Sequence, residues 1–308
     1  MTGAATGAAP LIDIQGVGHA YRTASGPLPV LDGLTLSVPE GGFVAVVGPS
    51  GCGKSTLTKL VAGLLVPDRG EVRLHGERVT GPRGTVGMAF QNPVLLEWRT
   101  ILRNVTLPLE IVPNRLSRAE REDRARGLLR LVGLEGFEDR RPSELSGGMR
   151  QRASLCRALV HRPEVLILDE PFGALDAFTR EDLWQTMHAL RAEERITTLL
   201  ITHDLREAVF LADRVVTLSG RPARTQAVLD VDLPPERSLE HLYTPRATEM
   251  LAELRAEIAV AQGRAPLARA GAPASDREAP VPGSAPNPAP GQRATPETLP
   301  DAAAGARR

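Results

Sequence analysis

Short apolar segments separated by polar stretches run along the first 220 residues of the chain. Two alternating segments, 11–14 and 34–38, precede the wholly apolar run 43–47, and a glycine-rich turn then leads into a helical pattern at 54–62. Further segments of strand length lie at 71–74, 86–90, 165–168, 198–202 and 215–218. The pattern predicts an α/β fold with a mostly parallel sheet and early antiparallel strands.

Helical patterns fill the region from about residue 95 to residue 160. Ser117 and Glu120 have the spacing of a capping box at the start of one helix. A second helix is predicted at about 147–161, with a proline just beyond its end. We therefore expect an α-helical subdomain inserted at about 95–160, which gives a single domain two lobes.

The end of the chain contains two parts of different composition. A helix fits Pro245–Ala261, because Thr244 can cap it and apolar residues follow along one stripe. From Gly263 onward more than half of the residues are Ala, Pro or Gly and none is aromatic, which predicts disorder. The expected division is a flexible N-terminus at 1–10, a main unit at 11–235, a helical extension at 236–262 and a disordered tail at 263–308.

Composition narrows the possible functions. The 37 basic and 37 acidic residues cancel, and there is no long basic block, which argues against binding along nucleic acid. No apolar run approaches the roughly 20 residues that span a bilayer, and residues 1–10 do not resemble a signal peptide. Cys52 and Cys156 form no disulfide framework, which suits a reducing cytosol. Any role at a membrane is therefore expected to depend on a partner.

Residues 48–56 read GPSGCGKST and match the phosphate-loop pattern G-x-x-x-x-G-K-[ST] between a predicted strand and a predicted helix. The glycines let backbone N–H groups point at phosphate oxygens. Lys54 is one of only two lysines in the chain, and its compact ammonium fits such a cradle better than a guanidinium would. We expect Lys54 to bind the β- and γ-phosphates of ATP and Ser55 to bind Mg²⁺. The predicted ATP-binding residues of the loop are Gly48, Pro49, Ser50, Gly51, Cys52, Gly53, Lys54, Ser55 and Thr56.

A second anion site is suggested by residues 145–152, which read LSGGMRQR. Ser146, Gly147 and Gly148 would present a hydroxyl and backbone N–H groups at a helix N-terminus, where the helix dipole favours an anion. The plainer alternative is an ordinary serine cap followed by two flexible residues. Because the phosphate loop already supplies a complete cradle, the first interpretation predicts that this site serves ATP held by another copy.

Two predicted strands end in residues that suit nucleotide chemistry. Asp169 and Glu170 follow the apolar run 165–168, and His203 follows the strand 198–202. Ligands of α/β sheets bind at the carboxyl ends of strands, so we expect these side chains near the phosphate loop. Each motif also has a plainer interpretation on its own: an acidic pair can begin a solvated loop, and a single histidine is usually structural.

These motifs and their order along the chain closely resemble those of the ATP-binding-cassette (ABC) ATPases over about residues 11–235. The resemblance implies a P-loop NTPase (RecA-like) core with an antiparallel β subdomain and an inserted α-helical subdomain. It implies an ATPase in which Asp169 holds Mg²⁺ through water, Glu170 orients and deprotonates the attacking water, and His203 contacts the γ-phosphate. A base positioned in this way typically contributes about 10²–10⁴ in rate.

Three further residues take roles by the same resemblance. Gln91 resembles the glutamine that joins the metal and the attacking water to the membrane partner, so it is expected to be both catalytic and a metal ligand. Asp176, which ends the segment FGALD, resembles the aspartate of a loop across the dimer seam. Tyr21 resembles the aromatic residue that stacks on adenine, with a core tyrosine at a strand end as the alternative.

The resemblance also implies partners. Cassettes of this family work as a head-to-tail pair, and a chain with one cassette would form a homodimer in which Ser146, Gly147 and Gly148 close on ATP held by the other copy. Closure and hydrolysis would drive integral membrane permease subunits, with an external solute-binding protein taking part indirectly. The implied location is peripheral, at the cytoplasmic face of the inner membrane, with no nucleic-acid partner.

A cluster of apolar residues follows Gln91 and has two interpretations: it can be simple core, or it can form a docking groove for a permease helix. This passage and residues 170–180 resemble the nitrate, sulfonate, taurine and bicarbonate branch of bacterial importers, although Glu97 replaces the proline expected before the tryptophan. The residues of the cluster are Leu95, Leu96, Trp98, Ile101 and Leu102.

Two other classes share the phosphate loop. Soluble cassette proteins that act on nucleic acid or ribosomes typically carry a long coiled-coil insertion or two linked cassettes, and neither is seen in this sequence. Small-molecule kinases lack a counterpart of LSGGMRQR. The sequence therefore favours the ATPase of an importer, whose transported solute is chosen by the permease and the external binding protein.

Overall fold

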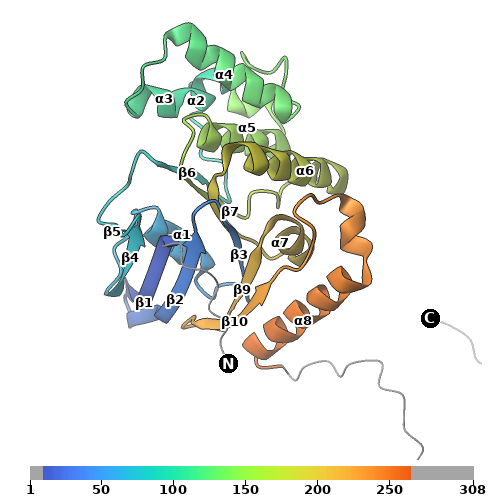
Figure 1. Cartoon of the computed structure of the whole chain (residues 1–308). Coiled ribbons are helices and arrows are strands. Elements are labelled where there is room, and N and C mark those ends of the chain that lie inside the picture. The colour runs from blue at the N-terminus through green and yellow to red at the C-terminus, as the bar shows by residue number, and fades with distance from the viewer. Residues whose placement is uncertain (1–9, 265–308) are drawn as a thin grey trace, which may run out of the picture. The chain divides into compact units, whose positions relative to one another are not determined.

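Two sheets and the helices that cover them make up residues 10–264, the part of the chain described by the computed structural model (Figure 1). The larger sheet has six strands in the order β10-β9-β3-β8-β7-β6. Its neighbours pair in parallel, except that β10 runs antiparallel to β9. The strands are β3 (Phe43–Val47), β6 (Val86–Ala89), β7 (Val165–Asp169), β8 (Thr197–Ile201), β9 (Arg214–Leu218) and β10 (Thr225–Asp230).

The central strands of this sheet are buried on both faces. Every residue of β3, β7 and β8 is buried, which explains why these strands appear in the sequence as unbroken apolar runs. Along β3, Val44 and Val46 belong to the core on one side of the sheet, whereas Phe43 and Ala45 belong to the core on the other. This alternation has the period of two that a strand imposes on its side chains.

The smaller sheet is antiparallel, in the order β2-β1-β4-β5. Its two longest strands have 14 residues each, more than the predicted segments 11–14 and 34–38. Register shifts on both sides of Val17 interrupt the pairing, and such bulges break the period-two pattern that the prediction relied on. The strands are β1 (Pro10–Thr23), β2 (Gly26–Pro39), β4 (Arg69–Leu74) and β5 (Glu77–Arg78).

Helix α1 (Lys54–Val61) follows β3 and the phosphate loop. Its Leu57 and Leu60 are fully buried in the core that also contains apolar side chains of both sheets. Lys54, at the first position of the helix, is thereby held at the carboxyl end of β3. The fold thus places the predicted phosphate loop at the edge of the sheet where β7 and β8 also end.

Four helices occupy the predicted insertion. They are α2 (Ile101–Val105), α3 (Leu107–Ile111), α4 (Arg118–Leu131) and α5 (Gly147–Leu159), with a short 3₁₀ turn before α5. The capping box of α4 is present: Ser117 Oγ accepts from Glu120 N at 3.3 Å, and Ser117 N donates to Glu120 Oε2 at 2.7 Å. Helix α5 contacts α2, α4 and β6, and it lies between the sheet and α2–α4 (Figure 1). The insertion is therefore joined to the sheet through α5.

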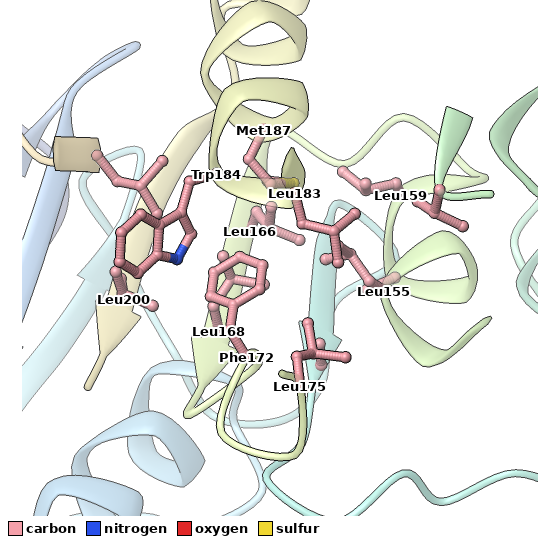
Figure 2. Close-up of a cluster of buried hydrophobic side chains, with 14 of the residues drawn as sticks. Leu155, Leu159, Leu166, Leu168, Phe172, Leu175, Leu183, Trp184, Met187 and Leu200 are labelled. Atoms are coloured by element: carbon pink, nitrogen blue, oxygen red, sulfur yellow. The ribbon is translucent and has the colours of Figure 1, made fainter. Parts of the chain in front are cut away.

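Two helices that the sequence analysis left out, α6 (Ala177–Glu194) and α7 (Leu205–Leu211), cover the same face of the large sheet as α5, opposite to the face that α1 covers. Figure 2 shows Leu183, Trp184 and Met187 of α6 packed over Leu166 and Leu168 of β7. These helices matter for the site because their N-termini follow the loops that carry Asp176 and His203.

The predicted C-terminal helix is α8 (Pro245–Ala261), capped by Thr244, whose Oγ1 accepts from Ala247 N at 3.3 Å. Its Met250 and Leu254 lie in the same core as α7, so the extension completes the core of the main unit. Arg237 Nη1 donates to three carbonyl oxygens at the end of α7, at 2.8, 2.9 and 3.1 Å.

The flexible N-terminus predicted at 1–10 and the disordered tail predicted at 263–308 fall almost entirely outside the described residues. Within the described residues, no helix combines the length and the apolar character that a membrane crossing requires.

Candidate functional site

A pocket of about 540 Å³ opens where β3, β7 and β8 end. Five separate segments of the chain that meet in it carry predicted residues: Tyr21 in β1, the phosphate loop, Gln91 after β6, Glu170 after β7 and His203 after β8. These are residues that the sequence analysis singled out individually. The fold therefore assembles them around one volume.

The phosphate loop is shaped by its glycines. Gly53 has φ of +123°, and a Cβ atom there would lie 2.6 Å from Val30 Cγ1, so neither its backbone nor its surroundings admit a side chain. Lys54 is buried, and its Nζ donates to the carbonyl oxygens of Gly48 at 2.8 Å and Pro49 at 3.0 Å. The carbonyl oxygens of the loop thus hold the Lys54 ammonium at the wall of the pocket.

Cys52 differs from the other loop residues because its thiol is buried in the core between the sheets. Burial raises the pKa of this thiol, and the nearby Lys54 only partly opposes that effect. Cys52 is not among the residues that line the pocket, so its thiol is not placed to contact a ligand there.

Asp169 lies directly behind Ser55. Ser55 Oγ donates to Asp169 Oδ1 at 3.2 Å, and Thr58 Oγ1 donates to Asp169 Oδ2 at 3.3 Å. Burial raises the pKa of the Asp169 carboxyl, while the hydrogen bonds from Ser55 and Thr58 lower it. Thr58 was missed by the sequence analysis, although it follows the phosphate-loop motif by only two residues.

The oxygen atoms of Ser55 and Asp169 suit Mg²⁺, a hard cation that prefers hydroxyl, carboxylate, phosphate and water oxygens. No group of three or more His, Cys, Asp or Glu side chains poised for a metal occurs in residues 10–264. Mg²⁺ does not need such a cage, because it is usually held by one or two carboxylates together with substrate phosphates and water. The residues present therefore fit a Mg²⁺ ion that arrives with a nucleotide.

Glu170 occupies the centre of the polar wall. Its Oε2 accepts from Gln91 Nε2 at 2.9 Å and lies 3.4 Å from His203 Nδ1. Its backbone is left-handed, with φ of +48°, and its N–H donates to Ile201 O at 2.8 Å. A non-glycine residue in this conformation costs about 1–2 kcal/mol, and such strain clusters at functional sites. Gln91 and His203, which come from distant segments, thus meet at one carboxylate oxygen of Glu170.

Tyr21 reaches the pocket from β1 of the smaller sheet. Its hydroxyl lies 3.2 Å from Thr56 Oγ1, and the ring of His19 stands edge-on to its ring at 5.1 Å between centroids. The tyrosine lines the pocket and also packs against the core between the sheets. The two interpretations of Tyr21, as adenine platform and as core residue, are therefore compatible.

Three pocket residues were not predicted: Leu28, Val30 and Arg221. Arg221 follows β9, the neighbour of β3, and reaches the pocket because Ala223 N donates to Val30 O at 2.8 Å. It brings a second cation to the pocket that holds Lys54. The signal was available, since Arg221 follows a strand that ends at the same edge of the sheet.

Ser146, Gly147 and Asp176 lie outside this pocket, among the exposed residues. Ser146 caps α5, with its Oγ accepting from Met149 N at 3.3 Å, and Asp176 caps α6, accepting from Thr179 N at 3.0 Å. The hydrogen bonds from Thr179 lower the pKa of Asp176. One copy of the chain therefore does not bring these residues to its own Lys54.

Gly148 connects the start of α5 to the loop before Asp176. A Cβ atom at Gly148 would lie 2.9 Å from Leu175 Cδ2, so a side chain here would collide with that loop. The second glycine of LSGGMRQR is thus explained by close packing within the subunit, whereas Ser146 and Gly147 face solvent.

A second, apolar pocket of about 520 Å³ lies between β6 and α3. Its walls include Met88, Phe90, Val94, Leu107 and Ile111, and Ile111 is 72% exposed. This apolar groove lies close to the cluster that followed Gln91 in the sequence, but it is built from other side chains.

The cluster itself belongs largely to the core. Leu95, Ile101 and Leu102 are buried, so the docking interpretation is wrong for these three residues. Their side chains are taken up by the packing of α2 against α4 and α5. Leu96 is half-buried, and only Trp98 is largely exposed, at 74%.

Known proteins resemble the chain in sequence and in structure. The family described as ABC transporter matches residues 31–173. The bicarbonate transport ATP-binding protein CmpD of Synechococcus elongatus is 42% identical over 234 residues, which cover 76% of this chain and 84% of that protein. The nitrate import ATP-binding protein NrtD of the same species is 46% identical over 224 residues, which cover 72% and 82%.

Solved structures show the same architecture. The dimeric structure of MJ0796, a bacterial ABC transporter cassette, matches with a TM-score of 0.67 and 31% identity, and the match covers 72% of this chain and 100% of that one. A dimeric post-hydrolysis state of MJ0796 bound to ADP and Pi matches with the same TM-score and 29% identity.

Proposed function

Since this chain belongs to the ABC transporter family and is an ATPase of that family, we propose that two copies hydrolyse ATP at composite sites and thereby energise a bacterial importer. One observation carries the proposal: Gln91, Glu170 and His203 converge on one oxygen in the pocket of Lys54, while Ser146 lies outside it. The pocket has residues for binding ATP and for activating water, and the anion site at Ser146 faces outward. This arrangement suits an ATPase that works as a dimer.

In this proposal the predicted site residues have defined tasks. Lys54 binds the β- and γ-phosphates, and the ring of Tyr21 stacks on adenine. Ser55 and Asp169, with Gln91, would hold Mg²⁺, which neutralises the charge on the phosphates. Glu170 accepts the proton of the attacking water.

The position of His203 supports its proposed contact with the γ-phosphate. Its ring is 65% exposed and lies beside the Glu170 carboxylate. A group on the γ-phosphate next to the base would hold the phosphorus atom in line for water attack, which is how most phosphoryl-transfer enzymes gain rate.

A mixing experiment tests the composite site. Lys54→Ala and Ser146→Arg variants should each be inactive alone, because each homodimer loses the same half of both sites. A 1:1 mixture should recover up to about a quarter of the wild-type ATPase rate, because half of the dimers are mixed and each of those keeps one intact site. Steady-state phosphate release from the mixed and unmixed variants measures this.

The unmixed variants, held at the same total concentration, are the controls. Full activity of Ser146→Arg alone, or of a wild-type monomer, would contradict the composite site. Mixed dimers that form but do not hydrolyse ATP would contradict it as well.

We propose that the permease subunits dock at the apolar groove. The groove is open, apolar and lies beside Gln91, whose backbone segment joins β6 to the insertion, so a helix seated there touches the segment that carries Gln91. An exposed apolar surface of this kind typically marks an interaction site.

A single charge in the groove tests this docking. Ile111→Glu should reduce recovery of the permease with the cassette from co-expressing membranes by roughly 10-fold or more, because burying an unpaired carboxylate is costly. Val228→Glu, at an exposed site on β10 away from the groove, is the matched control, and thermal unfolding midpoints check folding. Equal recovery with both variants would contradict docking at the groove. Recovery of ribosomes or DNA without any integral membrane protein would contradict the transporter proposal.

The class of the transported solute is proposed from the names of the relatives. Two of the relatives are named for bicarbonate and nitrate, which supports import of a small solute of the nitrate, sulfonate, taurine or bicarbonate class. In the proposal, an external solute-binding protein takes part only through the permease, and the chain lies at the cytoplasmic face of the inner membrane. The alternative of a cassette acting on nucleic acid or ribosomes gains no support from relatives named as transport proteins.

A further inference from the structure

Resting on the proposed function, we infer that Arg180 is a positioning residue that links the loop at the dimer seam to the loop that carries His203. No motif of the sequence analysis gave Arg180 a task. It lies in the first turn of α6, four residues after Asp176, and its guanidinium contacts both loops.

The two contacts of the guanidinium point in different directions. Arg180 Nη2 donates to the carbonyl oxygen of Leu175 at 3.0 Å, and Nη1 donates to Asp204 Oδ2 at 3.2 Å. The side chains of Arg180 and Asp204 are only 29% and 24% exposed, so this ion pair is partly shielded from water. A planar guanidinium can hold two acceptors in fixed relative positions, which a single ammonium cannot.

On one side, the contact reaches the backbone next to His203. Asp204 follows His203, and its second carboxylate oxygen, Oδ1, caps α7 by accepting from Arg206 N at 2.9 Å. The N–H of Asp204 donates to Thr202 Oγ1 at 2.9 Å, and that hydroxyl donates to the buried carboxylate of Glu207 at 3.1 Å. The residues on both sides of His203 are therefore held, and Arg180 supplies the anchor that comes from α6.

On the other side, the contact reaches the exposed serine turn. The Leu175 side chain packs against Gly148, at the start of α5, where a Cβ atom would lie 2.9 Å from Leu175 Cδ2. A continuous set of contacts thus runs from the turn of Ser146 through Leu175 and Arg180 to the loop of His203. In the proposed dimer, this turn meets the partner's ATP, so binding there is transmitted to the hydrolytic loop of the same subunit.

Arg180→Ala should slow single-turnover ATP hydrolysis by about 10- to 100-fold, because a misplaced catalytic group costs rate of this order. ATP affinity should change by less than about 2-fold, since Arg180 does not line the pocket. Arg180→Lys should lose less rate, because an ammonium keeps the pairing with Asp204 and gives up one of the two contacts.

Arg206→Ala is the matched control. Arg206 Nη2 donates to Glu181 Oε1 at 3.1 Å and so joins the same two helices, but within residues 10–264 its side chain makes no hydrogen bond to Leu175 or Asp204. Its rate should stay within about 2-fold of wild type. An equal loss of rate in Arg206→Ala and Arg180→Ala would overturn the inference, because general α6–α7 packing would then explain both.

A double-mutant cycle separates positioning from stability. If Arg180 acts through His203, the variant Arg180→Ala/His203→Ala should be no slower than His203→Ala alone, whereas independent effects would multiply. Multiplied losses would overturn the inference, with thermal midpoints checking that all variants fold. A wild-type rate in His203→Ala alone would instead refute the role of His203, so failure of the proposed function is recognised before the cycle is interpreted.

Discussion

Replacing Glu170 with Gln is expected to reduce ATP hydrolysis by roughly 10²- to 10⁴-fold while ATP binding stays intact, because an amide cannot accept the proton of the attacking water. The amide has the same shape and its oxygen can still accept from Gln91, so the pocket should keep its geometry. Without hydrolysis, the ATP-bound dimer should accumulate. Phosphate release, nucleotide binding and the molecular mass in the presence of ATP measure the three parts of this result.

Glu181→Gln is a suitable control for this substitution. Glu181 is also a partly exposed glutamate beside a basic side chain, with 24% exposure against 21% for Glu170, but it lies outside the pocket. This variant should hydrolyse ATP at nearly the wild-type rate. A Glu170→Gln variant that hydrolyses ATP normally would show that another group activates the water.

Lys54→Ala should act on an earlier step and weaken ATP binding by about 10- to 100-fold, because a hydrogen bond to a charged group contributes about 1.5–3 kcal/mol. The substitution also removes the donor that the carbonyl oxygens of Gly48 and Pro49 share, so the loop itself should be less ordered. Titration with a fluorescent ATP analogue measures the affinity.

The chain supplies an unusually clean control for Lys54. Lys59 is the only other lysine, and it lies on the exposed face of the same helix, α1. Lys59→Ala should bind ATP normally. Unchanged affinity in Lys54→Ala would disprove the assignment of the phosphate cradle, whereas equal weakening in both variants would point to the stability of α1.

The two variants separate binding from chemistry. Glu170→Gln should bind ATP without turnover and accumulate as the ATP-bound dimer, whereas Lys54→Ala should bind little ATP at ordinary ATP concentrations. A structure in which Glu170 lay away from the phosphate loop would not predict this difference.

Buried strands were the part of the fold easiest to predict. The strands β3, β7 and β8 are apolar along their whole length because both of their faces are covered, and their segments were identified within one or two residues. Helix α8 was predicted with its bounds, because Thr244 and Pro245 mark its start. Strong local signals of this kind do not depend on distant contacts.

Helix α6 shows where the prediction failed. Leu183 and Met187 are spaced as on a helix face and are buried, yet the charged residues 180–182 before them and the polar residues 185–186 between them dilute the pattern. The apolar cluster after Gln91 failed for another reason. Exposure depends on what covers a side chain, and nothing in residues 95–102 reveals that α2 turns Ile101 and Leu102 inward.

The site was predictable wherever a motif encodes a local shape. The phosphate loop, Glu170 and His203 each end a buried strand of one sheet, so their meeting follows from parallel topology. The contacts of Thr58 with Asp169 and of Arg180 with Asp204 come from tertiary packing between separate segments of the chain, and a single sequence does not report them. The roles given to individual residues remain predictions that the variants above can test.

The contacts of Arg237 determine where this chain can be shortened without damage to its fold. Its guanidinium lies outside the ATPase unit predicted at 11–235, yet it satisfies the carbonyl oxygens of Val209, Phe210 and Ala212 at the end of α7, where a helix has no partners of its own. In a chain that ends at residue 235, these oxygens would lose their hydrogen-bond donor, and the core that α8 covers would be exposed to solvent. The extension is therefore part of the folded unit, and substitutions should be tolerated best on its solvent-facing side.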